Sequence, residues 1–83
     1  MMAVIKYRGH MTKLTGKNEE TVNAASVSDV LSYIRDTYGK AAHKEAKRML
    51  IAVNGTNIQH LGRYKTALKD GDSVAFFPLS AGG

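Results

Sequence analysis

Apolar and polar positions alternate over short segments of the chain. A period near two in Ala3–Arg8 predicts a strand with one buried face. A second strand is expected within Lys13–Ala24, a stretch that a turn at Gly16–Asn18 divides into two segments. We interpret these strands as a hairpin at the start of a sheet.

The next segment has the spacing of an amphipathic helix. Ser26 is expected to cap this helix together with Asp29, and Gly39 is expected to end it in a left-handed conformation. One stripe of the helix should therefore face the core. The residues at the i, i+3, i+4 and i+7 positions of that stripe are Val27, Val30, Leu31, Ile34 and Tyr38.

A basic stretch and an apolar run follow. We interpret Lys40–Arg48 as a solvated connection with, at most, a short helical turn around its alanines. Met49–Val53 is apolar without alternation, as a central strand covered on both faces would be. Asn54-Gly55 predicts a tight hairpin turn, after which a short strand is expected near Thr56–Ile58.

The last strand is expected at Ser73–Phe77, after an irregular stretch and a turn at Asp70–Asp72. Alternation along this strand places Val74 and Phe76 in the core and Phe77 on the outer face.

Pro78 cannot donate a hydrogen bond to a neighbouring strand and is expected to end regular pairing. The chain is thus divided into a domain of residues 1–78 and a flexible tail of residues 79–83. The order strand, strand, helix, strand, short strand, strand indicates an α+β roll with one helix packed across a sheet.

Composition and charge narrow the classes of function. The 83 residues contain no cysteine, which excludes disulfides, cysteine-bound zinc and thiol nucleophiles. The apolar runs are too short for a membrane span and no export signal is visible, so a cytoplasmic protein is expected. The net charge of +5 favours anionic partners. A nucleic-acid-binding module is the lower-ranked alternative, because the basic residues fall in two blocks and are not interleaved with aromatic residues.

Catalytic and metal-ligating patterns are not found in the sequence. His10, His43 and His60 lack acidic companions at metal-ligand spacing, so no metal site is expected. Asp70 and Asp72 flank a glycine and are better explained as turn formers than as an acid–base pair.

The remaining candidate is the closing dipeptide Gly82-Gly83. Glycine has no Cβ and can therefore enter a narrow channel in a partner. A carboxylate becomes an acyl donor only after its oxygen is converted to a leaving group, for which adenylation by a nucleotide-using partner would serve. On the residues alone, a terminal Gly-Gly is more often incidental than functional.

The segment Leu68–Gly83 resembles the end of MoaD/ThiS-family sulfur carriers. A Leu-x-Asp-Gly-Asp turn, a Val-Ala-Phe-Phe-Pro strand and a closing Gly-Gly are matched at every position, and Asn54 resembles the Val-Asn element of the family. The resemblance implies a ubiquitin-like β-grasp fold: a mixed sheet of four to five strands, one main helix packed across it and a flexible Gly-Gly tail.

The function implied by the resemblance is that of a sulfur carrier. A ubiquitin-activating-type adenylyltransferase (MoeB/ThiF-like), using ATP and Mg, would adenylate Gly83, and a sulfurtransferase would supply the sulfur of a thiocarboxylate. The chain itself would bind no cofactor and would be the non-catalytic, sulfur-carrying subunit of a complex.

The length and the Phe-Phe-Pro favour the MoaD type, whose loaded tail enters the large subunit of molybdopterin synthase (MoaE-like). Other carriers with this tail donate sulfur to tRNA or to a thiazole precursor, or are conjugated to protein lysines. The tail does not distinguish these functions.

Partner contacts are expected at Phe77 and along the tail. An exposed aromatic side chain suits an interface anchor, and the extended backbone of the tail can form hydrogen bonds with a partner. The alternative is an aromatic ring partly buried under Lys40–Arg48. The expected neighbours on the outer face are Lys6, Arg8 and Asn57, a more polar set than a MoaD-type interface. The proposed contact residues are Phe77, Pro78, Leu79, Ser80, Ala81 and Gly82.

Overall fold

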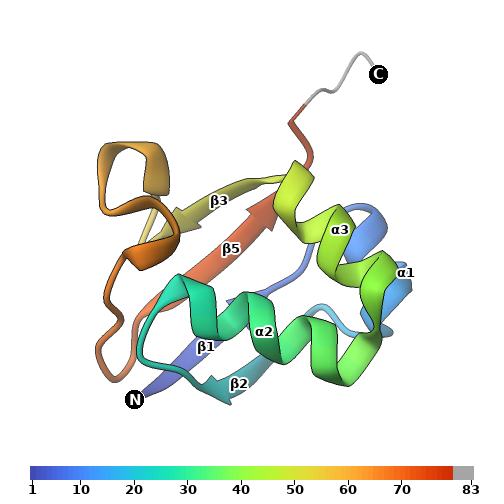
Figure 1. The fold of residues 1–83 in the computed structure, drawn as a ribbon, viewed down its shortest axis with the longest axis horizontal. Coiled ribbons are helices and arrows are strands. Elements are labelled where there is room, and N and C mark those ends of the chain that lie inside the picture. Colours follow the sequence, from blue (N-terminus) through green and yellow to red (C-terminus); the bar gives the residue numbers. More distant parts are fainter. Residues whose placement is uncertain (80–83) are drawn as a thin grey trace.

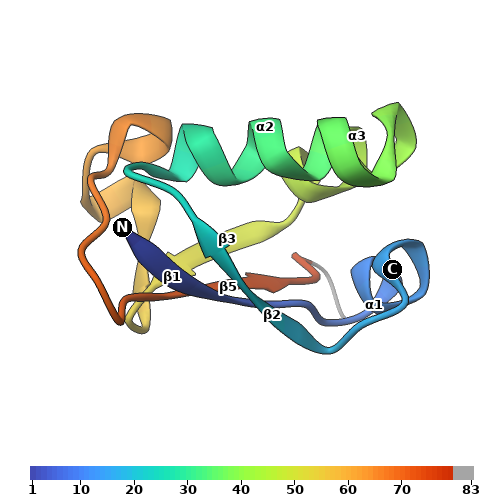
Figure 2. The same ribbon diagram turned by 90° about the horizontal axis from the view of Figure 1, so that it is seen from below.

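A five-stranded mixed sheet forms one layer and helices cover one of its faces (Figures 1 and 2). The computed structural model describes residues 1–79. The strand order is β2-β1-β5-β3-β4, with β1 and β5 parallel and the other neighbours antiparallel. The strands are β1 (Met2–Lys6), β2 (Glu19–Asn23), β3 (Leu50–Val53), β4 (Thr56–Asn57) and β5 (Ser73–Phe77). The helices are α1 (His10–Thr15), α2 (Val27–Tyr38), α3 (Lys40–Arg48) and the 3₁₀ turns η1 (Ile58–His60) and η2 (Arg63–Lys65).

The predicted main helix is confirmed as α2. Ser26 Oγ accepts from the N–H of Asp29 at 3.2 Å, and an Asp29 carboxylate oxygen accepts from the N–H of Ala25 at 2.9 Å. The expected apolar stripe is buried, except that Tyr38 is only partly covered. Gly39 has φ +99 and ψ 177, so it ends α2 with a positive φ but without the predicted left-handed helical conformation. It leads directly into α3.

The interpretation of Lys40–Arg48 as a solvated connection is wrong, because the whole stretch is helix α3. Ala42 and Ala46 are buried, and α3 packs against α2. Two small residues one turn apart give a weak apolar stripe, which is why the charged residues dominate the sequence pattern.

The predicted first hairpin is also only partly correct. The expected strand within Lys13–Ala24 begins at Glu19, and the segment before the turn belongs to α1. Met11 and Thr15, one helical turn apart, are both buried in α1. β2 pairs antiparallel with β1 over all five of its residues, as expected for the second strand of the sheet.

The predicted hairpin at Asn54-Gly55 is confirmed. Both residues have positive φ, 50° and 86°, as a two-residue type I′ turn requires. The turn joins β3 to the two-residue strand β4. In β5, Val74 and Phe76 are fully buried, so the predicted orientation of the last strand is confirmed as well.

A carboxylate joins β2 to α2 under the edge of the sheet. Glu20 Oε2 accepts from the hydroxyls of Tyr7 at 2.7 Å and Tyr38 at 2.6 Å, while Oε1 accepts from Tyr33 at 2.8 Å and Lys17 at 3.1 Å. We call these five residues the Glu20 cluster. Its hydrogen bonds connect β2, α2 and the residue that directly follows β1.

The Glu20 cluster perturbs the titration of its members. Burial alone would raise the pKa of the Glu20 carboxyl, but the hydrogen bonds from the three tyrosines and Lys17 together hold it below its ordinary value. Burial, followed by the hydrogen bond to Glu20, raises the pKa of Tyr38 to about 12 and raises that of Tyr7 further.

No helix within residues 1–79 is both long and apolar enough to cross a membrane.

Candidate functional site

The end of β5 carries the chain out of the fold. Phe77, the last residue of the strand, is 41% exposed, and its neighbour toward the N-terminus, Phe76, is fully buried. Pro78 follows without further pairing, and Leu79 is 68% exposed. The other predicted contact residues and the predicted sulfur-carrying residue lie outside the described part of the chain. They are Ser80, Ala81, Gly82 and Gly83.

Phe77 belongs to a small apolar surface on the outer face of the sheet. Its registered partner in β3 is Leu50, and the next pair on the same face is Ala52 with Ala75. We call these four residues the outer patch; Phe77 is its exposed member, Leu50 and Ala75 are half-buried and Ala52 is buried. Because α2 and α3 lie over the opposite face (Figure 2), the alternative of a ring buried beneath Lys40–Arg48 is wrong.

The expected polar neighbours of Phe77 are confirmed in part: Lys6 and Asn57 lie on this face of the sheet, but the residue directly opposite Phe77 in β3 is the apolar Leu50. Lys6 and Asn57 are registered with the two alanines of the outer patch, one pair further along the strands. Arg8 lies beyond the end of β1, where its Nη1 donates to the carbonyl oxygen of Tyr7 at 2.8 Å. The outer patch is therefore an apolar centre with one cationic and one amide neighbour.

Gly9 packs against the residue from which the tail leaves. A Cβ built on Gly9 would lie 2.8 Å from Cγ of Pro78, and Gly9 has φ +58. The loop between β1 and α1 thus supports Pro78 through a position that only glycine fills without displacement. Sequence reasoning missed this contact, because nothing in the local pattern around Gly9 indicates proximity to a residue so far along the chain.

We expect Gly9→Ala to lower the free energy of unfolding by about 1–3 kcal/mol, through both the positive φ and the clash with Pro78. Thermal unfolding of Gly9→Ala alone and in a Pro78→Ala background separates the two causes. Part of the loss should disappear in the double variant. Gly16→Ala is the matched control, because Gly16 has φ +73 and no neighbour within 4 Å. Equal losses with and without the proline ring would contradict a steric role.

The paired aspartates act as turn formers, as predicted. Asp72 accepts from Asn54 Nδ2 at 3.0 Å and from the N–H of Lys69 at 2.8 Å, and these hydrogen bonds lower the pKa of its carboxyl. Asp70 accepts from the N–H of Met2 at 2.8 Å. Asn54 therefore fastens the β3–β4 hairpin to the turn before β5, a role that its place in the sequence did not reveal.

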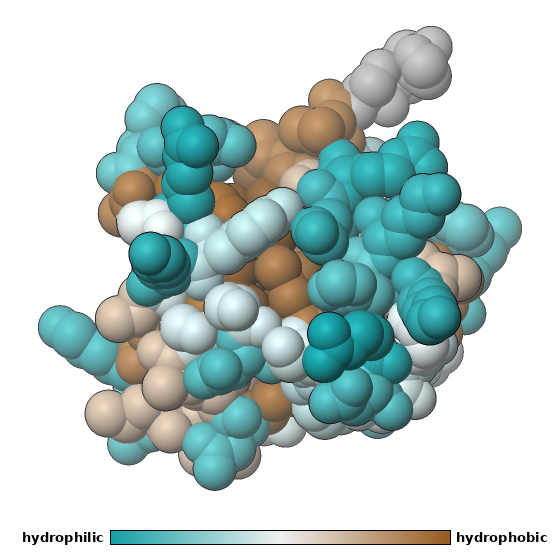
Figure 3. Space-filling view, in the orientation of Figure 1, coloured by the Kyte–Doolittle hydropathy of each residue, from teal (hydrophilic) through white to brown (hydrophobic). Residues whose placement is uncertain are grey.

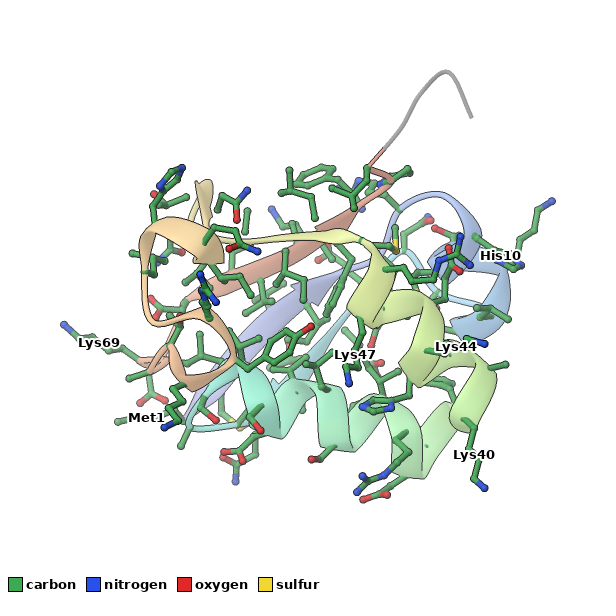
Figure 4. All side chains as sticks on the ribbon, turned by 45° about the horizontal axis from the view of Figure 1, so that its top comes forward. Met1, His10, Lys40, Lys44, Lys47 and Lys69 are labelled. Carbon is green, nitrogen blue, oxygen red and sulfur yellow. The ribbon has the colours of Figure 1, made fainter. Side chains whose placement is uncertain are left out.

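The histidines do not converge. Within residues 1–79 no three side chains of the His, Asp and Glu types are placed to hold a metal ion. His10 Nδ1 lies 4.0 Å from Glu45 Oε2 on the surface, where Figure 4 shows His10 at the α1 side of the molecule. His43 lies on α3 and His60 on η1.

Comparison with protein families finds a match to the ThiS family over residues 5–83. The chain is also similar to the solved structure of small archaeal modifier protein 1 from Methanosarcina acetivorans. The identity is 27% and the TM-score 0.84, with 99% of this chain and 96% of that chain covered. A comparison with curated proteins finds no match.

Two further solved structures are described as subunits of molybdopterin converting factor. A Pyrococcus furiosus protein assigned as subunit 1 is 27% identical, with a TM-score of 0.69 and coverage of 93% of this chain and 95% of that chain. A chain in the complex of subunits 1 and 2 from Helicobacter pylori is 23% identical, with a TM-score of 0.70 and full coverage of both chains. The expected ubiquitin-like β-grasp fold is confirmed by these similarities.

Proposed function

The chain belongs to the ThiS family of ubiquitin-like sulfur carriers and modifiers, and we propose that it carries sulfur on the carboxylate of Gly83. In this proposal the carboxylate attacks the α-phosphate of ATP in a ubiquitin-activating-type adenylyltransferase, and pyrophosphate leaves. Hydrosulfide (HS⁻), delivered by a sulfurtransferase, then attacks the carbonyl carbon and expels AMP, and the resulting thioacid loses its proton. The product is a C-terminal thiocarboxylate.

The observation that carries this proposal is the geometry at the end of β5. The strand is held on both sides, by β1 and β3, while Pro78 and the exposed Leu79 lead away from it. A rigid domain therefore presents the last residues to a partner without unfolding. The family match extends through Gly83, so the closing Gly-Gly falls within it.

The outer patch supplies a docking surface next to this exit. Phe77 and Leu50 form an apolar pair at the base of the tail, and an exposed aromatic residue of this kind is a frequent anchor of an interface. We propose that partners bind the domain at this patch and contact the tail at the same time. The tail residues Pro78 and Leu79 would extend the same contact along the partner.

For the final acceptor we propose the large subunit of a molybdopterin synthase, with the chain as the small subunit. Two observations support it: the 27% identity to the Pyrococcus furiosus subunit 1, and the apolar pair of Phe77 and Leu50 at the base of the tail. In the Helicobacter pylori structure, a chain of this fold is in complex with a second subunit.

Protein modification is the second candidate. It is favoured by the similarity to small archaeal modifier protein 1, which has the same identity but a higher TM-score. In this case the activated carboxylate would be attacked by a lysine amine of a target protein. Both functions require adenylation of Gly83, so they separate only at the acceptor.

The deciding experiment is intact mass spectrometry of the protein after incubation with ATP, Mg²⁺, a cognate adenylyltransferase and a sulfur source. We expect the exchange of one oxygen for sulfur at the C-terminus, dependent on ATP. Loaded protein is then offered either a molybdopterin-synthase large subunit with its pyranopterin substrate or a cell extract. Dithiolene formation supports the first candidate, whereas isopeptide-linked glycine on lysines supports the second. Absence of any ATP-dependent mass change refutes both.

A further inference from the structure

A groove of about 420 Å³ opens beside the base of the tail, between the last turn of α3 and the η1–η2 segment. Figure 3 shows apolar atoms exposed there between two hydrophilic rims. Its floor is formed by buried side chains of β3 and η1, and it reaches the tail at its open end. The apolar residues that line it are Met49, Leu50, Ile51, Ile58, Tyr64 and Leu79.

The groove follows a part of β3 that has no neighbouring strand on this side. β4 pairs only with Ala52 and Val53, whereas Leu50 and Ile51 have registered partners in β5 alone. An extended segment can lie along such an edge and place alternate side chains into the apolar floor.

The charged residues that line the groove are both cationic. Lys47 Nζ lies 6.0 Å from the centroid of the Tyr64 ring, so cation and ring together form one wall. Arg63 is the second charged lining residue. The acid nearest to this wall on α3, Glu45, is engaged with Arg48 at 3.5 Å. The field in the groove therefore favours an acidic ligand.

Arg63 has an uncommon backbone conformation, in a turn where its carbonyl oxygen accepts from Thr66 Oγ1 at 2.7 Å and from the N–H of Thr66 at 3.1 Å. Its φ is +53°, a value unfavourable for a residue with a Cβ. The other such residue, Asn54, has its positive φ because a type I′ hairpin turn demands it. Arg63 lies in an exposed 3₁₀ turn and has no ion-pair partner within residues 1–79.

We propose that this groove docks an extended peptide of a partner protein, with aliphatic side chains on the apolar floor and flanking acidic residues at Lys47 and Arg63. The open edge of β3 accounts for the extended conformation, the floor for the aliphatic residues and the two cations for the acids. Because Leu79 lines the groove, the docked peptide lies beside the base of the tail, and Leu50 is the one residue of the outer patch that it contacts.

The test is an NMR titration of the labelled protein with a synthetic peptide of β-branched aliphatic residues flanked by glutamates. A peptide with lysines in place of the glutamates is the charge control. We expect the acidic peptide to shift the resonances of Ile51, Ile58 and Tyr64, and the basic peptide to bind at least about tenfold more weakly.

Two variants and one control locate the binding. Lys47→Glu should weaken the acidic peptide about tenfold. Arg63→Gly should also weaken it severalfold, while the melting temperature stays the same or rises, because glycine relieves the positive φ. Lys40→Glu changes the same charge at the opposite end of α3, as Figure 4 shows, and should leave binding unchanged.

The proposal is overturned by three results. Equal binding of both peptides would mean that charge is not recognised. Shifts confined to Phe77, Ala75 and Ala52 would place the ligand on the outer face of the sheet. Shifts that grow with protein concentration without peptide would identify a second copy of the chain as the occupant. The titration needs neither ATP nor an adenylyltransferase, so its failure leaves the sulfur-carrier function untouched.

Discussion

Deletion of Gly83 is expected to reduce adenylate and thiocarboxylate formation to background and to change the free energy of unfolding by no more than about 0.5 kcal/mol. The first effect follows from the proposed chemistry, in which the reacting carboxylate must reach a position fixed by the length of the tail. The second follows from the packing, since within residues 1–79 the hydrophobic core ends at Phe76 and Leu79 is exposed.

Pyrophosphate release and intact mass measure the loading, and thermal unfolding measures the stability of the same preparations. Gly83→Ala is the informative control, because it keeps the length and the carboxylate but adds a Cβ. We expect it to be adenylated more slowly than the unaltered protein and faster than the deletion. Adenylation of the shortened chain at the original rate would show that the reaction does not depend on the length of the tail.

The second large effect is expected at Glu20, where substitution by alanine should lower the free energy of unfolding by about 2–4 kcal/mol. The ring of Tyr7 is fully buried, and its hydroxyl donates to Glu20 at 2.7 Å. Loss of the carboxylate leaves this donor without a partner and also removes the acceptor of Tyr33 and Tyr38. An unsatisfied buried donor is more costly than the hydrogen bond was favourable.

Chemical denaturation of a set of variants checks the cause. Glu19→Ala removes an exposed carboxylate from the adjacent position of β2 and should cost little. Glu20→Leu combined with Tyr7→Phe removes both partners of the buried hydrogen bond. The double variant should therefore be more stable than the sum of the single losses predicts. Additive losses would indicate that the two side chains are not coupled.

The same cluster predicts how stability depends on pH. The pKa of Glu20 is lower in the folded protein, so its contribution is complete above the unfolded value of about 4.5 and is lost as the pH falls through the folded value. The contribution of Tyr38 to stability changes with pH in the opposite direction. Its pKa is raised to about 12, so stability should fall as the pH rises above about 10. In Glu20→Gln, the free energy of unfolding measured by chemical denaturation should change less with pH below about 4.5.

Local patterns in the sequence identified the elements whose signals are local. The apolar stripe and the Ser26 cap predicted α2, the dipeptide Asn54-Gly55 predicted the type I′ turn, and alternation predicted the orientation of Phe77. Each of these depends on residues within one or two turns of each other. The family resemblance, carried by the last third of the chain, then supplied the fold.

Features formed by distant residues were missed. Helix α3 was not predicted because its buried side chains are only alanines, which give a weak apolar stripe. It is stabilised by packing against α2, a contact that the sequence of α3 alone does not indicate. Leu50 was not recognised as the neighbour of Phe77, since the register between β3 and β5 is set by pairing across the sheet. The support of Pro78 by Gly9 likewise joins opposite ends of the chain.

The central position of β5 has a mechanical consequence. The strand that leads to the tail is held by β1 on one side and by β3 on the other. A pull on the tail along β5 loads both ladders in shear, so their hydrogen bonds must fail together rather than one after another. Resistance to forced unfolding depends on the height of the unfolding barrier. The domain should therefore stay folded when a partner that has bound the tail applies a pulling force to it.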